Sequence, residues 1–140
     1  MYARIDLSKT FYKKIDFCKF EDPFPIDNLQ NLYREYCKYK KFRSVMPIFD
    51  SEFTDTKNDV IGYYDNQQLV AFSLLRRFDN ENVEAVQFAW NYNNPKLSLG
   101  INSLKNECAV YKELGFKYLY LGGADEYKQK IDGFELLGPL

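Results

Sequence analysis

The sequence contains no histidine among its 140 residues. This absence excludes histidine-based catalytic triads, histidine ligands for a metal ion and a histidine general base. Any acid–base chemistry therefore has to use carboxylates, tyrosine, lysine, cysteine or water.

Cysteine is also scarce, and the three positions that carry it, Cys18, Cys37 and Cys108, are far apart in the chain. No Cys-x-x-Cys pair is present, which argues against zinc and iron–sulfur sites. We expect reduced thiols in a cytoplasmic protein, and chemistry that requires neither a metal nor a resident cofactor. Cys108 is expected to belong to the core.

Long apolar runs and an excess of charge of one sign are missing too. No run approaches the roughly 20 residues that cross a bilayer, and the first residues lack the apolar core of a signal peptide, so we expect no membrane partner. The net charge of −1 provides no overall positive field to attract nucleic acid. Any contact with RNA has to be local.

Hydrophobic residues, by contrast, make up 46% of the chain and aromatic residues 18%. This composition predicts a packed globule rather than a disordered chain. The length suits one domain over residues 1–140 with a single core. Many of the rings are expected inside that core, and tyrosine offers a polar tip wherever a ring lines a cleft.

Two helices are predicted from capping signals and apolar spacing. The first follows a capping-box pattern at Asp27 and Gln30 and runs to about Lys41. The second is capped by Ser98 and ends at Gly115, where glycine accepts a left-handed conformation. Residues 125–130 are expected to add one or two helical turns.

The predicted strands come in two groups. Short alternating runs within residues 1–22 are typical of edge strands. Turn residues at Asp65-Asn66 and at 79–82 divide an antiparallel meander. The strand after the second helix lies parallel to its predecessor, because a helical crossover connects them. The strand ranges that we predict are 59–64, 69–78, 83–90, 116–121 and 133–137, with a loop over 44–57 that holds a short apolar piece at 45–49.

The stretch from Asn94 to Glu135 carries the strongest functional signal. Backbone amides at the start of a glycine-containing helix form a site for an anion or an acyl carbonyl, which singles out Ser98 and Gly100. The predicted strand 83–90, which precedes this helix, has a backbone edge that can bind an extended acyl donor. The acyl-donor site is therefore expected to include Gln87, Trp90, Tyr92, Ser98, Leu99, Gly100, Asn102 and Lys128.

The order of these elements resembles the GNAT acyltransferase fold, a mixed, mostly antiparallel α/β (α+β) sheet flanked by helices. The coenzyme A loop of that superfamily, [Q/R]-x-x-G-x-[G/A], corresponds here to residues 97–102. Leu97 stands where glutamine or arginine is usual, and Asn102 where the last small residue is usual. A pyrophosphate needs several free amides with little bulk around them.

A second resemblance fits these residues better. Ser98-Leu99-Gly100, Leu114-Gly115, the strand 118–122 and Tyr127-Lys128 are similar in order and spacing to the C-terminal catalytic region of arginyl-tRNA–protein transferases. The resemblance implies transfer of an aminoacyl group from tRNA to an amine of a peptide or small molecule.

The resemblances also imply roles for individual residues. The tyrosine that many GNAT enzymes place before a Gly-Phe strand protonates the leaving group, and Tyr127 precedes Gly133-Phe134 here. Lys128 pairs with a phosphate or carboxyl group. Independently of the resemblances, Asp125 and Glu126 in a polar loop are candidate bases for the attacking amine, although carboxylates in such loops are more often simply solvated.

A basic helix face offers a contact for tRNA through Arg34, Lys38, Lys41 and Arg43, with aromatic residues interleaved. The alternative is an ordinary solvated helix face, which is what most charged runs are.

Three hypotheses therefore remain on the sequence alone. The first is aminoacyl transfer from tRNA, and the second is an acetyl-coenzyme A-dependent N-acetyltransferase with a degenerate phosphate loop. The third is a non-catalytic binding module that keeps the fold.

Overall fold

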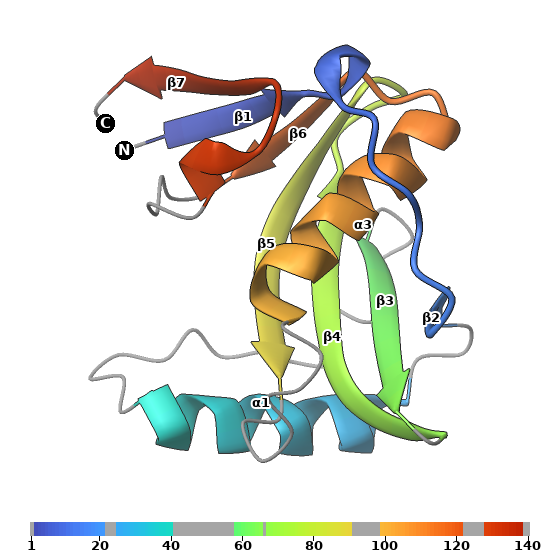
Figure 1. The fold of residues 1–140 in the computed structure, drawn as a ribbon. Coiled ribbons are helices and arrows are strands. Elements are labelled where there is room, and N and C mark those ends of the chain that lie inside the picture. The colour runs from blue at the N-terminus through green and yellow to red at the C-terminus, as the bar shows by residue number, and fades with distance from the viewer. Residues whose placement is uncertain are drawn as a thin grey trace.

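The computed structural model describes residues 2–21, 25–40, 58–65, 67–90, 99–121 and 128–138. Within these ranges the chain forms one seven-stranded sheet in the order β2-β3-β4-β5-β6-β1-β7 (Figure 1). The elements are the strands β1 (Tyr2–Asp6), β2 (Cys18–Phe20), β3 (Asn58–Asp65), β4 (Gln68–Arg77), β5 (Asn82–Trp90), β6 (Tyr118–Leu121) and β7 (Phe134–Gly138), the helices α1 (Ile26–Lys40) and α3 (Leu99–Glu113), and the 3₁₀ turns η1 (Leu7–Lys9) and η3 (Lys128–Lys130).

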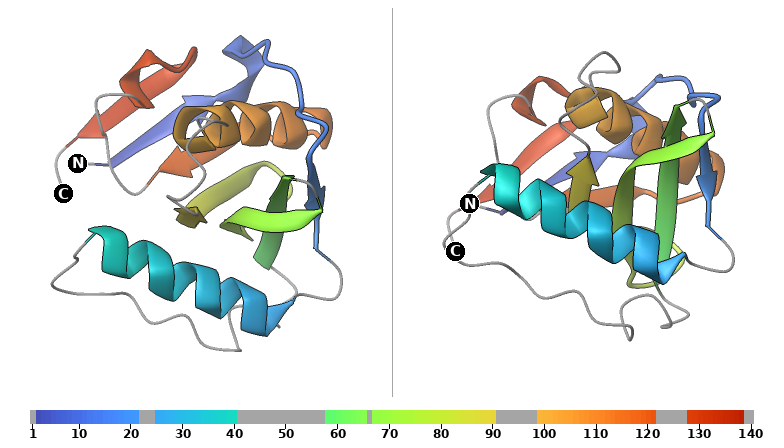
Figure 2. Two further views of the ribbon diagram at one scale, coloured as in Figure 1. Left: turned by 60° about the horizontal axis from the view of Figure 1, so that its bottom comes forward. Right: turned by 90° about the horizontal axis from the view of Figure 1, so that it is seen from below.

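The predicted mixed, mostly antiparallel sheet is confirmed. β3, β4 and β5 form the antiparallel meander. β5 and β6, which α3 connects, form the parallel pair. α1 lies across one face of the sheet and α3 across the other (Figure 2).

α1 covers the first face because its apolar residues recur every fourth position. Leu29, Tyr33 and Cys37 are buried on this helix. They pack with Phe72 and Leu74 of β4, together with residues of β3 and β5. The spacing predicted from the sequence therefore identified the buried side of the helix.

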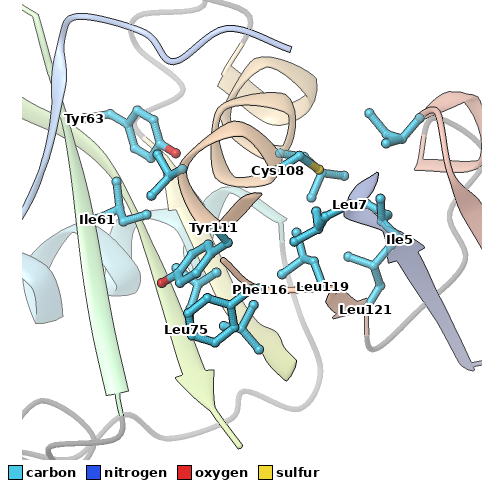
Figure 3. Close-up of a cluster of buried hydrophobic side chains, with 14 of the residues drawn as sticks. Ile5, Leu7, Ile61, Tyr63, Leu75, Cys108, Tyr111, Phe116, Leu119 and Leu121 are labelled. Carbon is cyan, nitrogen blue, oxygen red and sulfur yellow. The ribbon is translucent and has the colours of Figure 1, made fainter. Parts of the chain in front are cut away.

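The larger core lies between α3 and the opposite face (Figure 3). Cys108 and Tyr111 of α3 are fully buried there. The ring of Tyr111 makes edge-on contacts with the rings of Phe116 at 5.3 Å and Phe20 at 6.2 Å between centroids. The prediction that Cys108 is a core residue is confirmed.

The N-terminal strand corrects one prediction. The alternation in residues 1–22 indicated edge strands, which is right for β2 but wrong for β1. β1 pairs with β6 on one side and β7 on the other. Its Ala3 and Ile5 are fully buried in the α3 core, whereas Arg4 points to the opposite face, beside Tyr120 and Glu135. Alternation shows that one face is buried, but it does not show whether both edges are paired.

Smaller differences concern turns and element ends. The turn between β3 and β4 places Gln67 in the left-handed region at φ 68°, one residue beyond the predicted Asp65-Asn66. Of the turns predicted at 125–130, the described part is η3. The apolar piece at 45–49 and most of the loop around it lie outside the described residues.

Two glycines with positive φ provide a matched test of this packing. Gly133 has φ 80°, and an added Cβ there would overlap the carbonyl oxygen of Asp6; Gly115 has φ 95° and open space around it. Gly115→Ala is expected to lower the free energy of unfolding by about 1–2 kcal/mol through backbone strain alone. Gly133→Ala is expected to lower it by roughly 2 kcal/mol more, because a backbone atom has to move. Urea denaturation of both variants measures the difference, and equal losses would contradict the close contact.

Candidate functional site

The parallel strands β5 and β6 start together and then separate (Figure 1). They pair only from Asn82–Tyr118 to Ala85–Leu121. β5 continues to Trp90, and no described strand pairs with its last five residues on that side. Among the described residues, this half of β5 therefore has no ladder partner on the β6 side, and such a strand edge is one at which an extended ligand can bond.

A β-bulge lies where the pairing stops. Leu74 of β4 is opposite Gln87, whereas the next residue, Leu75, is opposite Ala85, so Val86 is an extra residue in β5. A bulge bends its strand and increases the local twist. The bulge thus accounts physically for the direction in which β5 leaves β6.

The N-terminal end of α3 lies beside this separated half of β5 (Figure 1). The helix begins at Leu99, with Gly100 as its second residue. Amides in a first helical turn have no partner within the helix and carry the positive end of the helix dipole. The separation of β5 from β6 and the start of α3 together form the candidate acyl-transfer site.

A buried polar cluster fixes α3 on the sheet. The carboxylate of Glu107 is 3% exposed and accepts hydrogen bonds from the hydroxyls of Tyr63, at 2.6 Å, and Ser73, at 2.7 Å. Tyr63 belongs to β3 and Ser73 to β4, and the Tyr63 ring points toward α3 (Figure 3). One side chain of α3 is therefore bonded to two strands.

The cluster extends toward the N-terminal segment through Asn106. Its amide nitrogen lies 3.2 Å from the Tyr63 hydroxyl and 3.4 Å from the Cys18 sulfur. Its amide oxygen accepts a bond of 2.8 Å from the backbone N–H of Ile15. Residues 15–18 are thus attached to the same helix position.

Burial changes the acidity of these groups. Removal from water raises the pKa of Glu107 to about 7, against the opposing effect of the bonds from Tyr63 and Ser73. Burial, and then the neighbouring Glu107, also raise the pKa of Tyr63 well above its usual value, so its hydroxyl remains a donor. The ring of Tyr63 makes an edge-on contact with the ring of Phe88, with 6.5 Å between the centroids. Because Phe88 belongs to the separated half of β5, the cluster is in contact with that half.

The predicted donor-binding residues lie in different parts of this arrangement. Gln87 is half-buried on β5, and its side-chain amide donates to the carbonyl of Phe88 at 2.9 Å. Trp90 ends β5, opposite Ala71. Leu99, Gly100 and the half-buried Asn102 form the first turn of α3, and Lys128 begins η3. Tyr92, Ser98, Asp125, Glu126 and Tyr127 lie outside the described residues.

Two of the residues predicted to contact tRNA, Arg34 and Lys38, lie on the exposed side of α1. Arg34 bonds to Asn31 at 2.8 Å, and Lys38 lies 3.6 Å from Glu35. Both cations therefore have partners on their own helix. Lys41 and Arg43 lie outside the described residues.

Two adjoining hollows lie at the β2 edge of the sheet, away from the separated strands. The larger has a volume of about 600 Å³ and the smaller about 450 Å³, and both are lined by Asp16, Cys18 and Lys19. Their shared lining makes them one shallow groove along the outermost strand.

Among the described residues, no group of three or more cysteine, aspartate or glutamate side chains is placed to hold a metal ion. Within the same residues, the helices are too short or too polar to cross a membrane.

The Glu107 cluster is the part that reasoning from the sequence missed. Interpretation of the second helix followed only its apolar stripe. Ser103, Asn106 and Glu107 are buried next to that stripe. Their spacing of three and four residues is the signal that they share a helix face with Leu104 and Cys108.

Comparison with known proteins gives a family match and structural neighbours. The family model described as "Arginine-tRNA-protein transferase, C terminus" matches residues 11–132. No curated protein matches the chain.

Among solved structures, the C-terminal domain of a putative lysylphosphatidylglycerol synthetase from Agrobacterium fabrum is 16% identical, with a TM-score of 0.67 over 86% of this chain and 45% of that one. L-PGS from Bacillus licheniformis is 15% identical, with a TM-score of 0.67 over 88% of this chain and 46% of that one. An aminoglycoside acetyltransferase from an uncultured soil metagenomic sample is 13% identical, with a TM-score of 0.57 over 81% of both chains. The chain spans less than half the length of the first two structures. At these identities the likeness concerns the fold.

The buried carboxyl group gives a testable pH dependence. Because the pKa of Glu107 is raised from 4.5 to about 7 by folding, the folded protein keeps a proton that the unfolded chain releases. The free energy of unfolding is therefore expected to fall by about 3 kcal/mol as the pH rises from about 4.5 to 7. Glu107→Gln, which keeps an acceptor oxygen and cannot ionise, is expected to remove this decrease.

Urea denaturation across that pH range measures the effect. Glu113→Gln is the matched control, because it removes an exposed carboxylate from the same helix without touching the cluster. A Glu107→Gln profile with the wild-type slope would show that the cluster does not carry the pH dependence.

Proposed function

We propose, on the premise that this chain belongs to the family of arginine-tRNA-protein transferase C-terminal regions, that it transfers an aminoacyl group from tRNA to an amine. The family and the fold make it an acyltransferase of the GNAT-like type. What we propose beyond this is the identity of the two substrates: aminoacyl-tRNA as the donor and an amine as the acceptor.

The separation of β5 from β6 beside the start of α3 is the observation that carries this proposal. An ester carbonyl placed there meets helix N-terminal amides on one side and the backbone edge of β5 on the other. Backbone amides aimed at a carbonyl stabilise the negative charge that develops on its oxygen during attack. An extended donor can bond along the edge of β5 as an added strand does.

The proposed reaction is direct transfer. The acceptor amine attacks the ester carbonyl, a C–N bond forms, and the C–O bond to the ribose breaks. The amine loses one proton, and the ribose oxygen gains one. No covalent enzyme intermediate is needed.

The chain offers one candidate group for each proton. Tyr127 is proposed to donate to the leaving ribose oxygen, and Asp125 to accept from the amine. Both follow β6 and precede η3 in sequence, so they belong to the connection that leaves the separated end of the parallel pair. Lys128, half-buried at the start of η3, is proposed to neutralise a phosphate or carboxylate of the bound substrates.

An aminoacyl-tRNA donor is favoured over acetyl-coenzyme A by the first turn of α3. Asn102 occupies the position where the coenzyme A loop has its last small residue, and its side chain is half-buried. Calorimetry with acetyl-coenzyme A tests the choice. Micromolar binding would favour the N-acetyltransferase alternative, whereas binding of charged tRNA alone supports the proposal.

Gly100 gives a first prediction for the site. Gly100→Val is expected to reduce transfer from aminoacyl-tRNA by about tenfold or more, because side-chain bulk prevents close approach to the amides. The free energy of unfolding is expected to stay near the wild-type value. Ala109→Val, a half-buried position on the same helix, is the control for added bulk. Equal turnover in Gly100→Val and wild type would remove this turn from the mechanism.

Tyr127 gives a second prediction. Tyr127→Phe is expected to lower the transfer rate by about a hundredfold, since the phenol is the proposed proton donor, while circular dichroism and thermal unfolding remain unchanged. Tyr64→Phe, on β3, is the control tyrosine. Unchanged turnover in Tyr127→Phe would exclude the assigned role.

A further inference from the structure

We propose that the RNA part of the donor binds a basic and aromatic surface along the outer side of α3. This inference rests on the proposed function. We call this region the Phe11 surface, and its residues come from the segment after β1, from α3 and from η3: Lys9, Phe11, Tyr12, Lys13, Lys105, Lys112 and Lys130.

Phe11 is the most exposed large hydrophobic side chain among the described residues, with 83% of its surface accessible. The ammonium group of Lys112 lies 4.3 Å from the centre of its ring and also donates to the carbonyl of Thr10. Lys112 therefore holds one side of the ring, and the other side faces solvent. An exposed ring with a cation next to it is a platform on which a nucleobase can stack.

Tyr12 joins the three parts of the surface. Its hydroxyl accepts a bond of 2.9 Å from the backbone N–H of Asp132, just after η3. The ammonium group of Lys105 lies 5.5 Å from the centre of its ring. These contacts place the N-terminal segment against α3 and against the residues between η3 and β7 (Figure 1).

The surface includes five lysines, and a carboxylate lies near it: the bonds from Ser8 and, to a smaller extent, the charge of Lys9 lower the pKa of Asp6. Lys9, Lys13 and Lys130 are exposed, and none of them forms an ion pair with a described carboxylate. The neighbouring Lys14 forms an ion pair with Glu113 at 2.5 Å, so we do not count it in the Phe11 surface. Because the whole chain has a net charge of −1, this concentration of lysines is a local feature that complements a phosphate backbone.

The position of the surface also suits RNA. Lys105 and Lys112 are seven residues apart and share one helix face. Lys105 lies five residues after Gly100, which is about 8 Å along the helix axis. An RNA strand that stacks on Phe11 and follows these lysines therefore leads to the first turn of α3, where the ester carbonyl is proposed to bind. Arg34 and Lys38 of α1, by contrast, have partners in Asn31 and Glu35.

Fluorescence anisotropy with a labelled RNA hairpin tests the surface, using one hairpin with a single-stranded 3′ end and one that is blunt. Phe11→Ala is expected to weaken binding of the first hairpin by about tenfold and of the blunt hairpin by less, because stacking needs an unpaired base. The double variant Lys105→Gln/Lys130→Gln is expected to weaken both and to reduce the dependence of log K on log salt by about two. Lys112 is kept because it bonds to Thr10.

The control is Arg34→Gln/Lys38→Gln on α1, which is expected to bind as wild type. Circular dichroism and urea denaturation confirm that each variant is folded. Loss of binding in the α1 variant, with wild-type binding in the Phe11 surface variants, would overturn the inference. Binding of anionic vesicles but of neither hairpin would overturn it too.

Transfer from an aminoacyl ester of adenosine separates this inference from the proposed function, because that donor is too small to reach Phe11. Transfer that is equal in wild type and Phe11→Ala, together with the loss of hairpin binding, supports both. If transfer from the adenosine ester is again equal but every Phe11 surface variant binds the hairpin as wild type does, the RNA-binding role of the surface is overturned and the proposed function stands. If the hairpin binds through the surface but no donor gives transfer, RNA binding by the Phe11 surface is supported and the proposed aminoacyl transfer is contradicted.

Discussion

The carboxyl group of Glu107 is enclosed in the core, and this single buried acid restricts how α3 can lie on the sheet. Taking a carboxyl group out of water is costly unless hydrogen bonds replace those it had. The donors are Tyr63 on β3 and Ser73 on β4, at 2.6 and 2.7 Å. A helix that slid or rotated would leave three buried polar groups without partners, so the position of its N-terminal turn follows from this cluster.

The second constraint is the bulge in β5. Four residues of β5 pair with β6, and the strand then turns away at the extra residue, Val86. Two neighbouring strands that separate leave backbone groups without ladder partners, which is unfavourable in a core and useful at a site. Phe88 connects the two constraints, because it lies opposite Ser73 and contacts the ring of Tyr63. The buried acid thus holds α3 while the bulge turns β5 away from β6 beside it.

The N-terminal part of the chain serves both the fold and the proposed donor surface. β1 fills the place between β6 and β7, although the family match begins only at residue 11. The segment that follows crosses α3 to reach β2 at the far edge. Hydrogen bonds between its Thr10, Tyr12 and Ile15 and, respectively, Lys112, Asp132 and Asn106 hold it there. Because this segment is attached to α3, its exposed aromatic ring has a defined position relative to the first turn of that helix.

Local patterns in the sequence determined a large part of this protein. Periodicity of 3.6 residues located both helices, alternation and turn residues located the meander, and a helical crossover implied the parallel pair of β5 and β6. The stretch from Ser98 to Lys128 was enough to indicate the family. These features depend on neighbours within a few residues, which is why they can be read along the chain.

Only the tertiary structure decided the rest. That β1 is central and that Glu107 is buried with Tyr63 and Ser73 both depend on partners from distant parts of the chain. The Phe11 surface likewise exists only because three separate segments meet: the one after β1, α3 and the residues around η3. Hydrogen bonds and packing between residues 30 to 120 positions apart leave no periodic trace in the sequence, and so they became visible only once the chain was folded.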